Sequence, residues 1–499
     1  MKNRRKMLTK MLNIIKEKMK YVVLIFIVLS GVFIGMLSFV SPLIVLFLVL
    51  FLILLPLVIL PLLIYLIKRP EYCLYLFVFS LPFWEVLVFD IGFHLRFPYL
   101  TFLLLFFSVL INKRLHLRDI QKSDINYLLM LIIAVGILSS FNSFAIPPNK
   151  EVLLNALRNK PFIISITRVI LLSFMVLIYF VTLGMITNER ILKNVLRVLV
   201  LSSSLIAIYG LIAAILSFVH IRLTLWGHPA YVIDFAHVIR LQATLQEPTF
   251  FANFLLVTLT LLIILSLTKD TFVFADHNRV NLLLIILFVA FVLTFSRAGF
   301  IALAIATMII MFILFGHPDF QDLRRTSVKY MIMGLILLLM FMVIISPFNQ
   351  IVERMDTLFV SPITGIFDKS SHKYESTRQR LETMNAALST YPTHPIIGIG
   401  MANYYFYDKA GRPEINNFPL KVLVETGLLG VLVWSILTVR IVYLLLKGTR
   451  RKRSHHLSLG LLFGFFAVSL QYLFMSSIFF PYLWVFLAII VATGGLGEE

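Results

Sequence analysis

Charged residues are scarce in this chain of 499 residues. Asp, Glu, Lys and Arg together make up 14% of it, whereas 60% is hydrophobic, and the mean hydropathy is +0.96. A soluble domain is about half apolar and about a quarter charged, while a disordered chain has low hydrophobicity and high charge. The composition therefore excludes both a water-soluble globular enzyme and a disordered protein as descriptions of the whole chain.

Cysteine and acidic residues are also scarce. The single cysteine, Cys73, lies in an apolar run, which excludes a disulfide framework or a CxxC metal site within one chain. The chain has 24 Asp and Glu and 44 Lys and Arg, which give a net charge of +20. In an apolar chain this excess is typical of cytoplasmic loops facing anionic membrane lipids, and we expect no nucleic-acid partner. No small-residue cleavage site follows the basic N-terminus, which predicts an uncleaved first span.

Long apolar runs make up most of the remaining sequence. A helix that crosses a bilayer needs about 20 apolar residues, so we predict an all-α polytopic membrane protein with about 12–14 transmembrane helices. The predicted spans start near Tyr21, Leu43, Tyr72, Phe97, Ile125, Phe162, Val195, Thr249, Asn281, Gly299, Tyr330, Leu420, Leu457 and Ser477. The third is the weakest, because Pro82, Glu85 and Asp90 interrupt it.

Lys and Arg are concentrated in alternate gaps between these spans, which predicts that both termini are cytoplasmic. The predicted organisation is a basic cytoplasmic N-terminus at 1–20, a helix bundle at 21–345, a large external loop at 346–419 and C-terminal transmembrane helices at 420–499. Loops this long are usually functional or disordered. A helical pattern from Ser376 to Leu388, ended by Pro392 and Pro395, favours an ordered external cap.

Two polar clusters lie where predicted external loops enter spans. The first runs from Arg240 through Glu247 and Pro248 to Asn253, and the alternative to a functional site is a helix cap with a local ion pair. The second is Thr294-Phe-Ser-Arg-Ala-Gly, which places Arg297 between two apolar runs with almost no loop. A snorkelling arginine is the alternative there. The small residues beside Arg297 favour an anion site instead, because they leave room for a ligand to approach the guanidinium.

Two further clusters lie in and just after the long loop. One holds Arg378 and Arg380, followed by His394-Pro-Ile-Ile-Gly-Ile-Gly, in which Gly398 and Gly400 predict a tight turn with close backbone approach. The other runs from Glu414 into the next span, where Glu425 needs a charged partner at membrane depth. For this carboxylate, a structural ion pair is the alternative to a site.

Several arginines on one membrane face indicate an anionic amphiphile, because the guanidinium is always charged and its planar fork suits phosphate. A lipid diphosphate fits, with its tail in the bilayer and its phosphates at the surface. No pair of aspartates accompanies the arginines, so we expect neither a metal nor another cofactor. Arginines can stabilise the charge of a leaving diphosphate by themselves.

Three of these segments resemble motifs of the O-antigen ligase and O-antigen polymerase superfamily of bacterial envelope glycan assembly. They are Thr294-Phe-Ser-Arg-Ala-Gly, His394-Pro-Ile-Ile-Gly-Ile-Gly and Leu423-Val-Glu-Thr-Gly-Leu-Leu-Gly. The resemblance implies a type C glycosyltransferase-like fold in the bacterial inner (plasma) membrane, with its active site on the external, periplasmic face. It also implies an undecaprenyl-diphosphate-linked glycan donor, a glycan or lipid acceptor, and a role in polysaccharide or lipopolysaccharide biosynthesis.

Ligases of this family carry a histidine as a candidate base where this chain has Asn416, followed by the matching Asn417. Asparagine cannot act as a general base at pH 7, so we predict that Glu247 or Glu414 activates the acceptor. The predicted catalytic group is Glu247, Glu414 and Asn416. The predicted substrate- and diphosphate-binding group is Arg240, Arg297, Arg378, Arg380, Asn417 and Tyr404. The predicted structural group is Gly398, Gly400, Glu425 and Gly427.

Three functions are compatible with these motifs. A polymerase would add a growing glycan to another lipid-linked repeat unit, in association with a flippase and a chain-length regulator. A ligase would transfer a finished glycan to a lipid A-core or protein acceptor. A lipid-linked glycan transporter is the third, although transporters usually show paired repeats and broken helices at mid-bilayer. The absence of the histidine favours the polymerase.

Overall fold

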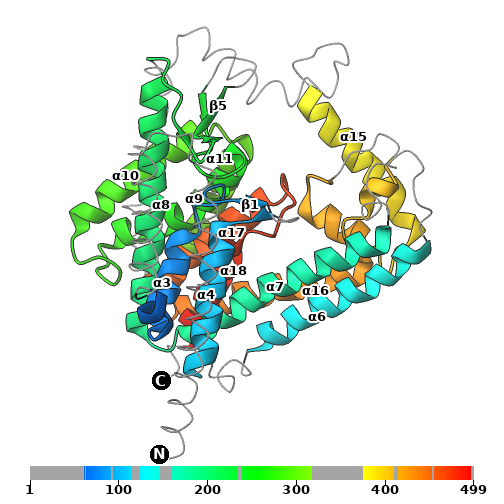
Figure 1. The fold of residues 1–499 in the computed structure, drawn as a ribbon, viewed down its shortest axis with the longest axis horizontal. Coiled ribbons are helices and arrows are strands. Elements are labelled where there is room, and N and C mark those ends of the chain that lie inside the picture. The colour runs from blue at the N-terminus through cyan, green and yellow to red at the C-terminus, as the bar shows by residue number, and fades with distance from the viewer. Residues whose placement is uncertain are drawn as a thin grey trace, which may run out of the picture. The chain divides into compact units, whose positions relative to one another are not determined.

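The computed structural model describes residues 61, 63–90, 94–113, 123–145, 160–217, 219–233, 239–316, 375–408, 414–451 and 455–495. The chain divides into two compact units, Met1–Arg69 and Pro70–Glu499. All helices and strands named below belong to the second unit (Figure 1). The predicted spans that start near Tyr21, Leu43 and Tyr330 lie outside the described residues.

Helices dominate the second unit, which confirms the all-α membrane fold. The helices that correspond to predicted spans are α3 (Pro70–Ser80), α4 (Phe97–Asn112), α6 (Asp124–Phe141), α7 (Pro161–Met185), α8 (Glu189–Ser217), α9 (Pro248–Thr268), α10 (His277–Leu293), α11 (Arg297–Gly316), α16 (Phe418–Thr449), α17 (His455–Gln471) and α18 (Pro481–Gly495). In the described part, six of them (α6, α7, α8, α9, α11 and α16) are long and apolar enough to cross a membrane alone.

The boundaries of α3, α8 and α18 are among those that differ from the predicted span starts or lengths. Helix α3 ends at Ser80 and is too short to cross a bilayer alone, because Pro82 follows and the chain turns into the hairpin of β1 (Phe89–Asp90) and β2 (His94–Leu95). Helix α8 begins at Glu189, where Asn188 Oδ1 accepts a hydrogen bond from the Ile191 N–H at 2.9 Å. Helix α18 begins only at Pro481, since residues 475–480 are not helical.

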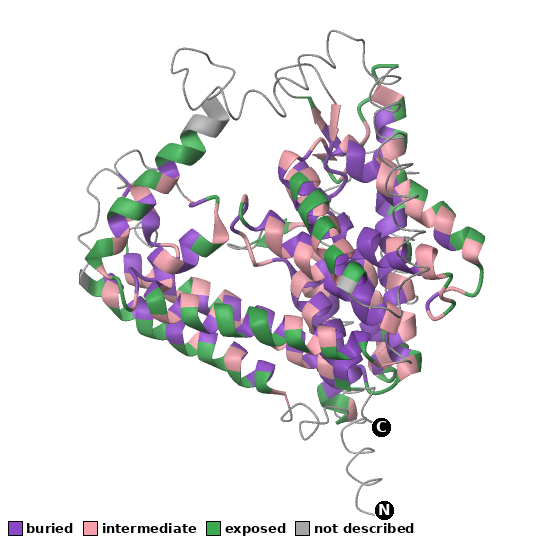
Figure 2. Ribbon diagram, turned by 180° about the vertical axis from the view of Figure 1, so that it is seen from behind, coloured by how far each residue is buried: buried purple, intermediate pink, exposed green. Residues whose placement is uncertain are grey.

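Helix α9 forms the centre of the packing. In its apolar stretch of 18 residues, 78% of the residues are buried (Figure 2). Gly460 and Gly464 of α17 let that helix approach α9 closely, because a Cβ there would lie about 3 Å from Leu261 or Thr260. Buried polar groups join α9 to α17 and α18, where Asn253 Nδ2 donates to Gln471 Oε1 at 3.0 Å. The hydroxyl of Tyr482 donates to Asn253 Oδ1 at 2.8 Å. A buried amide needs such partners.

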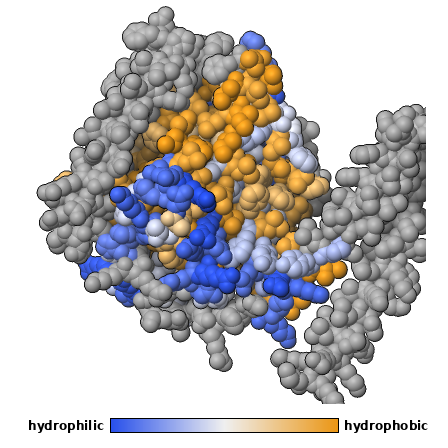
Figure 3. All heavy atoms as spheres, turned by 90° about the vertical axis from the view of Figure 1, so that its left-hand side faces the viewer, coloured by the Kyte–Doolittle hydropathy of each residue, from blue (hydrophilic) through white to orange (hydrophobic). Residues whose placement is uncertain are grey.

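The flank of the unit formed by α8 and α10 is covered with exposed apolar side chains, as expected of a surface in contact with lipid. They include Leu201, Leu205, Ile208 and Ile212 on α8, and Leu282 and Ile285 on α10. Figure 3 shows this face as largely hydrophobic, with hydrophilic groups gathered toward one end.

The outer end of the bundle is defined here as the end that holds the starts of α9, α11 and α16 and the end of α17. It carries two antiparallel hairpins, β3 (Thr224–Leu225) with β4 (His228–Pro229), and β5 (Tyr231–Ile233) with β6 (Ile239–Leu241). The predicted helix in the long loop is confirmed as α15 (Glu375–Thr390). This end corresponds to the predicted external face.

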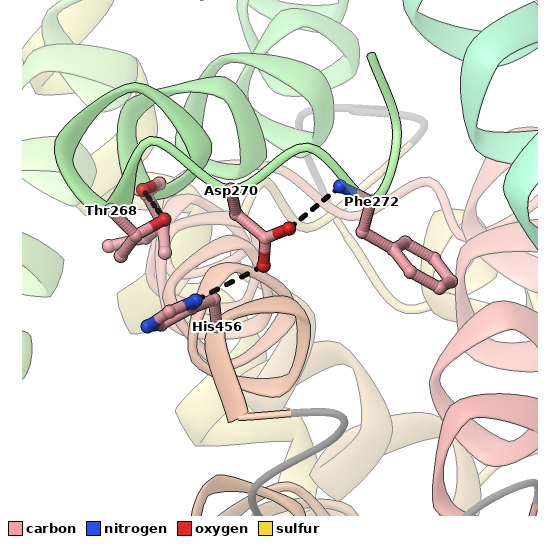
Figure 4. A network of polar contacts seen from close by, with 5 residues as sticks. Thr268, Asp270, Phe272 and His456 are labelled. Atoms are coloured by element: carbon pink, nitrogen blue, oxygen red, sulfur yellow. Dashed lines mark hydrogen bonds and ion pairs between the residues drawn. The ribbon is translucent and has the colours of Figure 1, made fainter. Parts of the chain in front are cut away.

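The opposite end is joined by a polar network around Asp270, between α9 and α10 (Figure 4). Asp270 Oδ2 lies 3.1 Å from His456 Nδ1 on α17. Asp270 Oδ1 accepts a hydrogen bond from the Phe272 N–H at 2.7 Å. The hydrogen bond with His456 is the main cause of a lowered pKa of Asp270.

Candidate functional site

The His394–Gly400 segment inserts into a break in α16. Gly427 has φ +67° inside this helix, while Gly398 and Gly400 have φ +82° and +91°. Glycine adopts such left-handed conformations without the steric cost that a Cβ imposes. A Cβ on Gly427 would overlap the Ile396 carbonyl, and one on Gly398 would overlap the peptide between Glu425 and Thr426. The predicted tight turn with close backbone approach is confirmed.

Backbone hydrogen bonds of the helix are exchanged for bonds to the inserted loop. In a regular helix, the N–H groups of residues 428 and 429 donate to the carbonyls of residues 424 and 425. Here four bonds replace those two: Leu428 N–H to Pro395 O (2.9 Å), Leu429 N–H to Ile396 O (3.2 Å), Ile399 N–H to Val424 O (3.1 Å) and Gly400 N–H to Glu425 O (3.0 Å). The break therefore leaves none of these four helix groups without a partner, as membrane depth requires.

Helices α6 and α7 anchor the same loop. Asn142, just after α6, donates from Nδ2 to Gly398 O at 2.7 Å. Asn403 donates to the Ser143 hydroxyl and to Ile399 O. Gly400 lies close to Ser143 and Ser165. The loop is thus held by hydrogen bonds to α16 and to the residues just after α6, and it lies close to α7.

Tyr404 lies in an apolar core of the long loop and not at its surface. It is 1% exposed, packs with Ala387 and Ile399, and donates from its hydroxyl to Thr383 O at 3.2 Å. These contacts join α15 to the inserted segment. They support a structural role for Tyr404 and leave its predicted contact with a diphosphate unsupported.

The structure brings the first two predicted clusters together. Arg240 on β6 donates from Nε to Thr294 O at 3.3 Å and from Nη2 to Phe295 O at 3.5 Å. Those carbonyls belong to the turn that precedes Arg297, the first residue of α11. Two arginines therefore meet at one turn at the outer end of the bundle.

The small residues after Arg297 have a packing role that the sequence interpretation missed. Gly299 lies against α9 and α10, where a Cβ would come within 3.2 Å of Ala252 of α9 and of Phe291 of α10. Ala298 is 8% exposed. The Ser296 hydroxyl accepts a hydrogen bond from the Gly299 N–H at 3.2 Å, which caps the start of α11. Helix packing and capping explain these residues without a ligand.

Glu247 and Arg380 interact electrostatically between α9 and α15. Glu247 is exposed at the start of α9 and makes no side-chain cap hydrogen bond, which argues against the capping alternative. Desolvation lowers the pKa of Arg380, and the charge of Glu247 partly offsets that shift. The side chain of Arg378 lies outside the described part of the structure.

A second polar cluster surrounds Glu414 at the start of α16. Ser476 donates from its hydroxyl to Glu414 Oε2 at 2.9 Å, and Lys421 Nζ lies 3.6 Å from Glu414 Oε1. Burial raises the pKa of Glu414, but the charge of Lys421, the hydrogen bond from Ser476 and the charge of Arg168 together lower it below its usual value. The Glu414 side chain is therefore a carboxylate at neutral pH.

A small cavity of about 40 Å³ lies beside this cluster, lined by Arg168, Lys421, Glu425 and Ser476 among others. Glu425 is 4% exposed, in α16. Arg168 of α7 lies over the Phe479 ring at 5.5 Å. Within the described ranges, no hydrogen bond or ion pair reaches the Arg168 guanidinium. Basic and acidic groups thus share one cavity at the outer end.

The two asparagines after Glu414 differ in their surroundings. Asn417 caps α16, accepting from the Leu420 N–H at 2.9 Å and donating to Leu473 O at 2.9 Å. Its amide is committed to the helix start, which supports a structural role in place of the predicted substrate contact. Asn416 is exposed beside the cluster.

Sequence reasoning missed Arg168, Lys421 and Ser476 as site residues. Signals for the two charged ones were present. Lys421 precedes Glu425 by four residues, the spacing of an ion pair on one helix face. Arg168 lies two turns inside a span, where a charge is a functional candidate by default. Ser476 gave no local signal, because only the fold brings it to Glu414.

The non-helical segment 475–480 contacts the cluster around Glu414 and the start of α9, near Glu247. Its Ser476 contacts Glu414, and its Phe480 ring packs against Phe250, three residues after Glu247, at 4.9 Å. On its other side Phe480 contacts Trp84, whose ring lies 4.3 Å from the Arg96 guanidinium. Both groups of charges therefore border the same end of the bundle.

Residues 282–435 match the family described as O-Antigen ligase. The matched region runs from α10 through α11 and α15 to the middle of α16. It includes Arg297, Arg380, the inserted glycine turn, Glu414 and Gly427. Among curated proteins, no match to the chain is found. The match confirms the resemblance to the O-antigen ligase and O-antigen polymerase superfamily. A membrane glycan-transfer function with lipid-linked glycan and acceptor substrates follows from it.

Proposed function

We propose that this protein is a membrane glycan polymerase. It transfers a growing glycan from undecaprenyl diphosphate to a sugar hydroxyl of another lipid-linked repeat unit, on the external face of a bacterial inner membrane. The observation that carries the proposal is the Glu414 carboxylate, held by Ser476 and Lys421 beside Asn416. It supplies a base next to the position at which ligases of the family have histidine.

Arg240, Arg297 and Arg380 form the donor half of the proposed site. Arg240 and Arg297 meet at the turn before α11, and Arg380 of α15 interacts electrostatically with Glu247. The fixed charge and planar fork of arginine suit a diphosphate. These cations would stabilise the negative charge that develops on the departing diphosphate without requiring a metal. Arg378 remains a candidate for the same role.

The proposed reaction is a direct displacement. The acceptor hydroxyl oxygen bonds to the anomeric carbon of the donor sugar, and the bond from that carbon to the diphosphate oxygen breaks. Glu414 takes the hydroxyl proton, and the diphosphate leaves with the bonding electron pair. A positioned general base contributes typically 10²- to 10⁴-fold to a rate. Glu247 is the second candidate for the base, although it faces Arg380 and no hydroxyl donor orients it among the described residues.

A ligase remains the main alternative, because it uses the same donor and the same arginines. Asn416 favours the polymerase. Ligases have histidine at that position, and asparagine does not titrate near neutral pH as histidine does. A transporter of lipid-linked glycans is the second alternative. Polar groups gathered at one end of the bundle favour an enzyme that works at the surface over a pathway through the bilayer.

A chain-length assay tests the proposal. Purified protein in liposomes receives an undecaprenyl-diphosphate repeat unit of the host, with EDTA and no other acceptor. We expect a ladder of longer lipid-linked glycans, which disappears in R297A and persists in R279A. Arg279 is a suitable control because it is an exposed arginine at the other end of α10. Transfer only after a second acceptor is added would establish a ligase. No transfer with either acceptor would contradict the enzyme proposal.

A further inference from the structure

An apolar groove of about 480 Å³ runs along α16 between α6, α17 and α18. Its volume lies in the range of ligand pockets, about 300–1,000 Å³. On α16 its lining extends from Phe418 to Ile441, a rise of about 35 Å, which is enough to cover the hydrocarbon core of about 30 Å. Almost all of its lining side chains are apolar, and Ser435 and Thr438 of α16 are exposed beside it. A groove of this length and character suits one extended hydrocarbon chain.

The groove continues into the polar cavity at its outer end. Phe418, Val422, Trp434 and Ile478 line both the groove and the cavity that holds Arg168 and Lys421. The Arg168 guanidinium lies in that cavity without a hydrogen bond or ion pair to any described residue. An apolar groove that ends at a cation matches an amphiphile with one long tail and an anionic head.

We propose that this groove holds the polyprenyl tail of the lipid-linked acceptor, with the phosphate of that lipid at Arg168. The inference rests on the proposed function. It assigns the lipid-linked acceptor to a binding site separate from the donor arginines. Those arginines lie on β6, α11 and α15, whereas the groove is lined by α6, α16, α17 and α18.

The position of Glu414 explains why the acceptor, and not the donor, belongs in the groove. Lys421 lines the cavity and lies 3.6 Å from Glu414, and Ser476 joins the same carboxylate to the cavity wall. A lipid seated in the groove therefore brings its attached sugar to the proposed base. The segment 475–480 connects this position to the start of α9, where the donor side begins.

Photolabelling of the full-length protein in liposomes tests this inference without turnover. The probe is undecaprenyl monophosphate with a diazirine in its tail, and labelled peptides are mapped by mass spectrometry. We expect labels on the groove-facing stretches of α16, α17 and α18. Unlabelled undecaprenyl monophosphate should compete, whereas phosphatidylglycerol should not. Labelling should persist in R297A, because the donor arginines are not part of the groove.

Matched tryptophan variants test whether the groove itself is occupied. T438W fills the groove, and we expect at least a tenfold loss of α16–α18 labelling. L432W places the same ring on an exposed position of α16 outside the groove and should label like the wild type. R168Q should weaken competition by the monophosphate while leaving that by uncharged undecaprenol unchanged.

Three outcomes would overturn the inference: labels confined to other helices, unchanged labelling of T438W, or equal competition by phosphatidylglycerol. The last would identify the groove as a site for bulk lipid. Failure of the proposed function would give a different result, namely normal labelling of the groove with no ladder in the chain-length assay. A ladder that forms with an unlabelled groove would reject the groove and keep the polymerase.

Discussion

Gly398 of the inserted loop and Gly427 of α16 lie on the two sides of one close backbone contact. A Cβ on Gly427 would overlap the Ile396 carbonyl, two residues before Gly398. A Cβ on Gly398 would overlap the Glu425–Thr426 peptide, immediately before Gly427. The pair therefore permits the loop to dock into the helix, and the docked loop fixes Glu425 beside the polar cavity.

Replacing Gly427 with alanine should undock this loop. Ala at a positive φ costs about 1 kcal/mol or more, and the overlap with Ile396 adds to that cost. We expect G427A to lose activity more than tenfold and to make the 395–400 segment sensitive to protease. G227A is the matched control, since Gly227 has φ +77° but no atom within 4 Å of its Cβ position. Equal behaviour of the two variants would show that backbone strain alone, and not docking, matters.

Arg240 should act partly through the turn that precedes Arg297. Because it donates to the carbonyls of Thr294 and Phe295, R240A should loosen that turn as well as remove a charge. We expect R240A and R297A each to lower the polymerisation rate more than 100-fold, and R297K to retain more activity than R297A. Their double variant should cost less than the product of the single effects. Rates measured in the liposome assay decide this, and full additivity would indicate independent roles.

We expect Glu414 to be the general base of the reaction. E414Q keeps the size of the side chain and removes its charge, so we expect a loss of 10²- to 10⁴-fold in rate. E247Q should lose less than tenfold. A lower rate in E247Q than in E414Q would reverse the assignment of the base.

The pH dependence of the rate provides an independent check on Glu414. Because its folded pKa is lowered from 4.5, the rate should stay level as the pH falls from 7.5 to about 5.5. In E414Q, adding N416H should restore part of the rate and introduce an acidic limb near pH 6.5, the ordinary pKa of histidine. A limb near pH 6.5 in the wild type would contradict the proposed base.

The contact between Asp270 and His456 should stabilise the end of the bundle opposite the site. The folded pKa of Asp270 is lowered, so its contribution is present above the unfolded pKa of about 4 and is lost as the pH falls through the folded value. D270N should lower the midpoint of thermal unfolding by about 1–2 °C at pH 7. The difference should shrink below about pH 4, and glycan transfer should not change. A difference that grows on acidification would contradict this sign.

The membrane class, the helix content and most of the helix starts could be predicted from the amino-acid sequence alone. These follow from composition and from the length of apolar runs, which are local properties of the chain. The helix within the long loop and the tight turn at Gly398 and Gly400 were also predictable, because periodicity and glycine act over a few residues. The arginine motifs indicated the superfamily for the same reason.

Which of these segments come into contact could be seen only in the folded chain. The exchange of hydrogen bonds between the loop and α16, the contact of Asn142 with Gly398 across 256 positions, and the meeting of Arg240 with the turn before Arg297 depend on helix packing. Ser476 reaches Glu414 across 62 positions, and Arg168 reaches the same cavity from another helix. Hydropathy sets which residues enter the membrane, but close contacts between side chains decide which helices become neighbours. The polar cluster around Glu414 and the adjoining apolar groove therefore could not be predicted from local sequence.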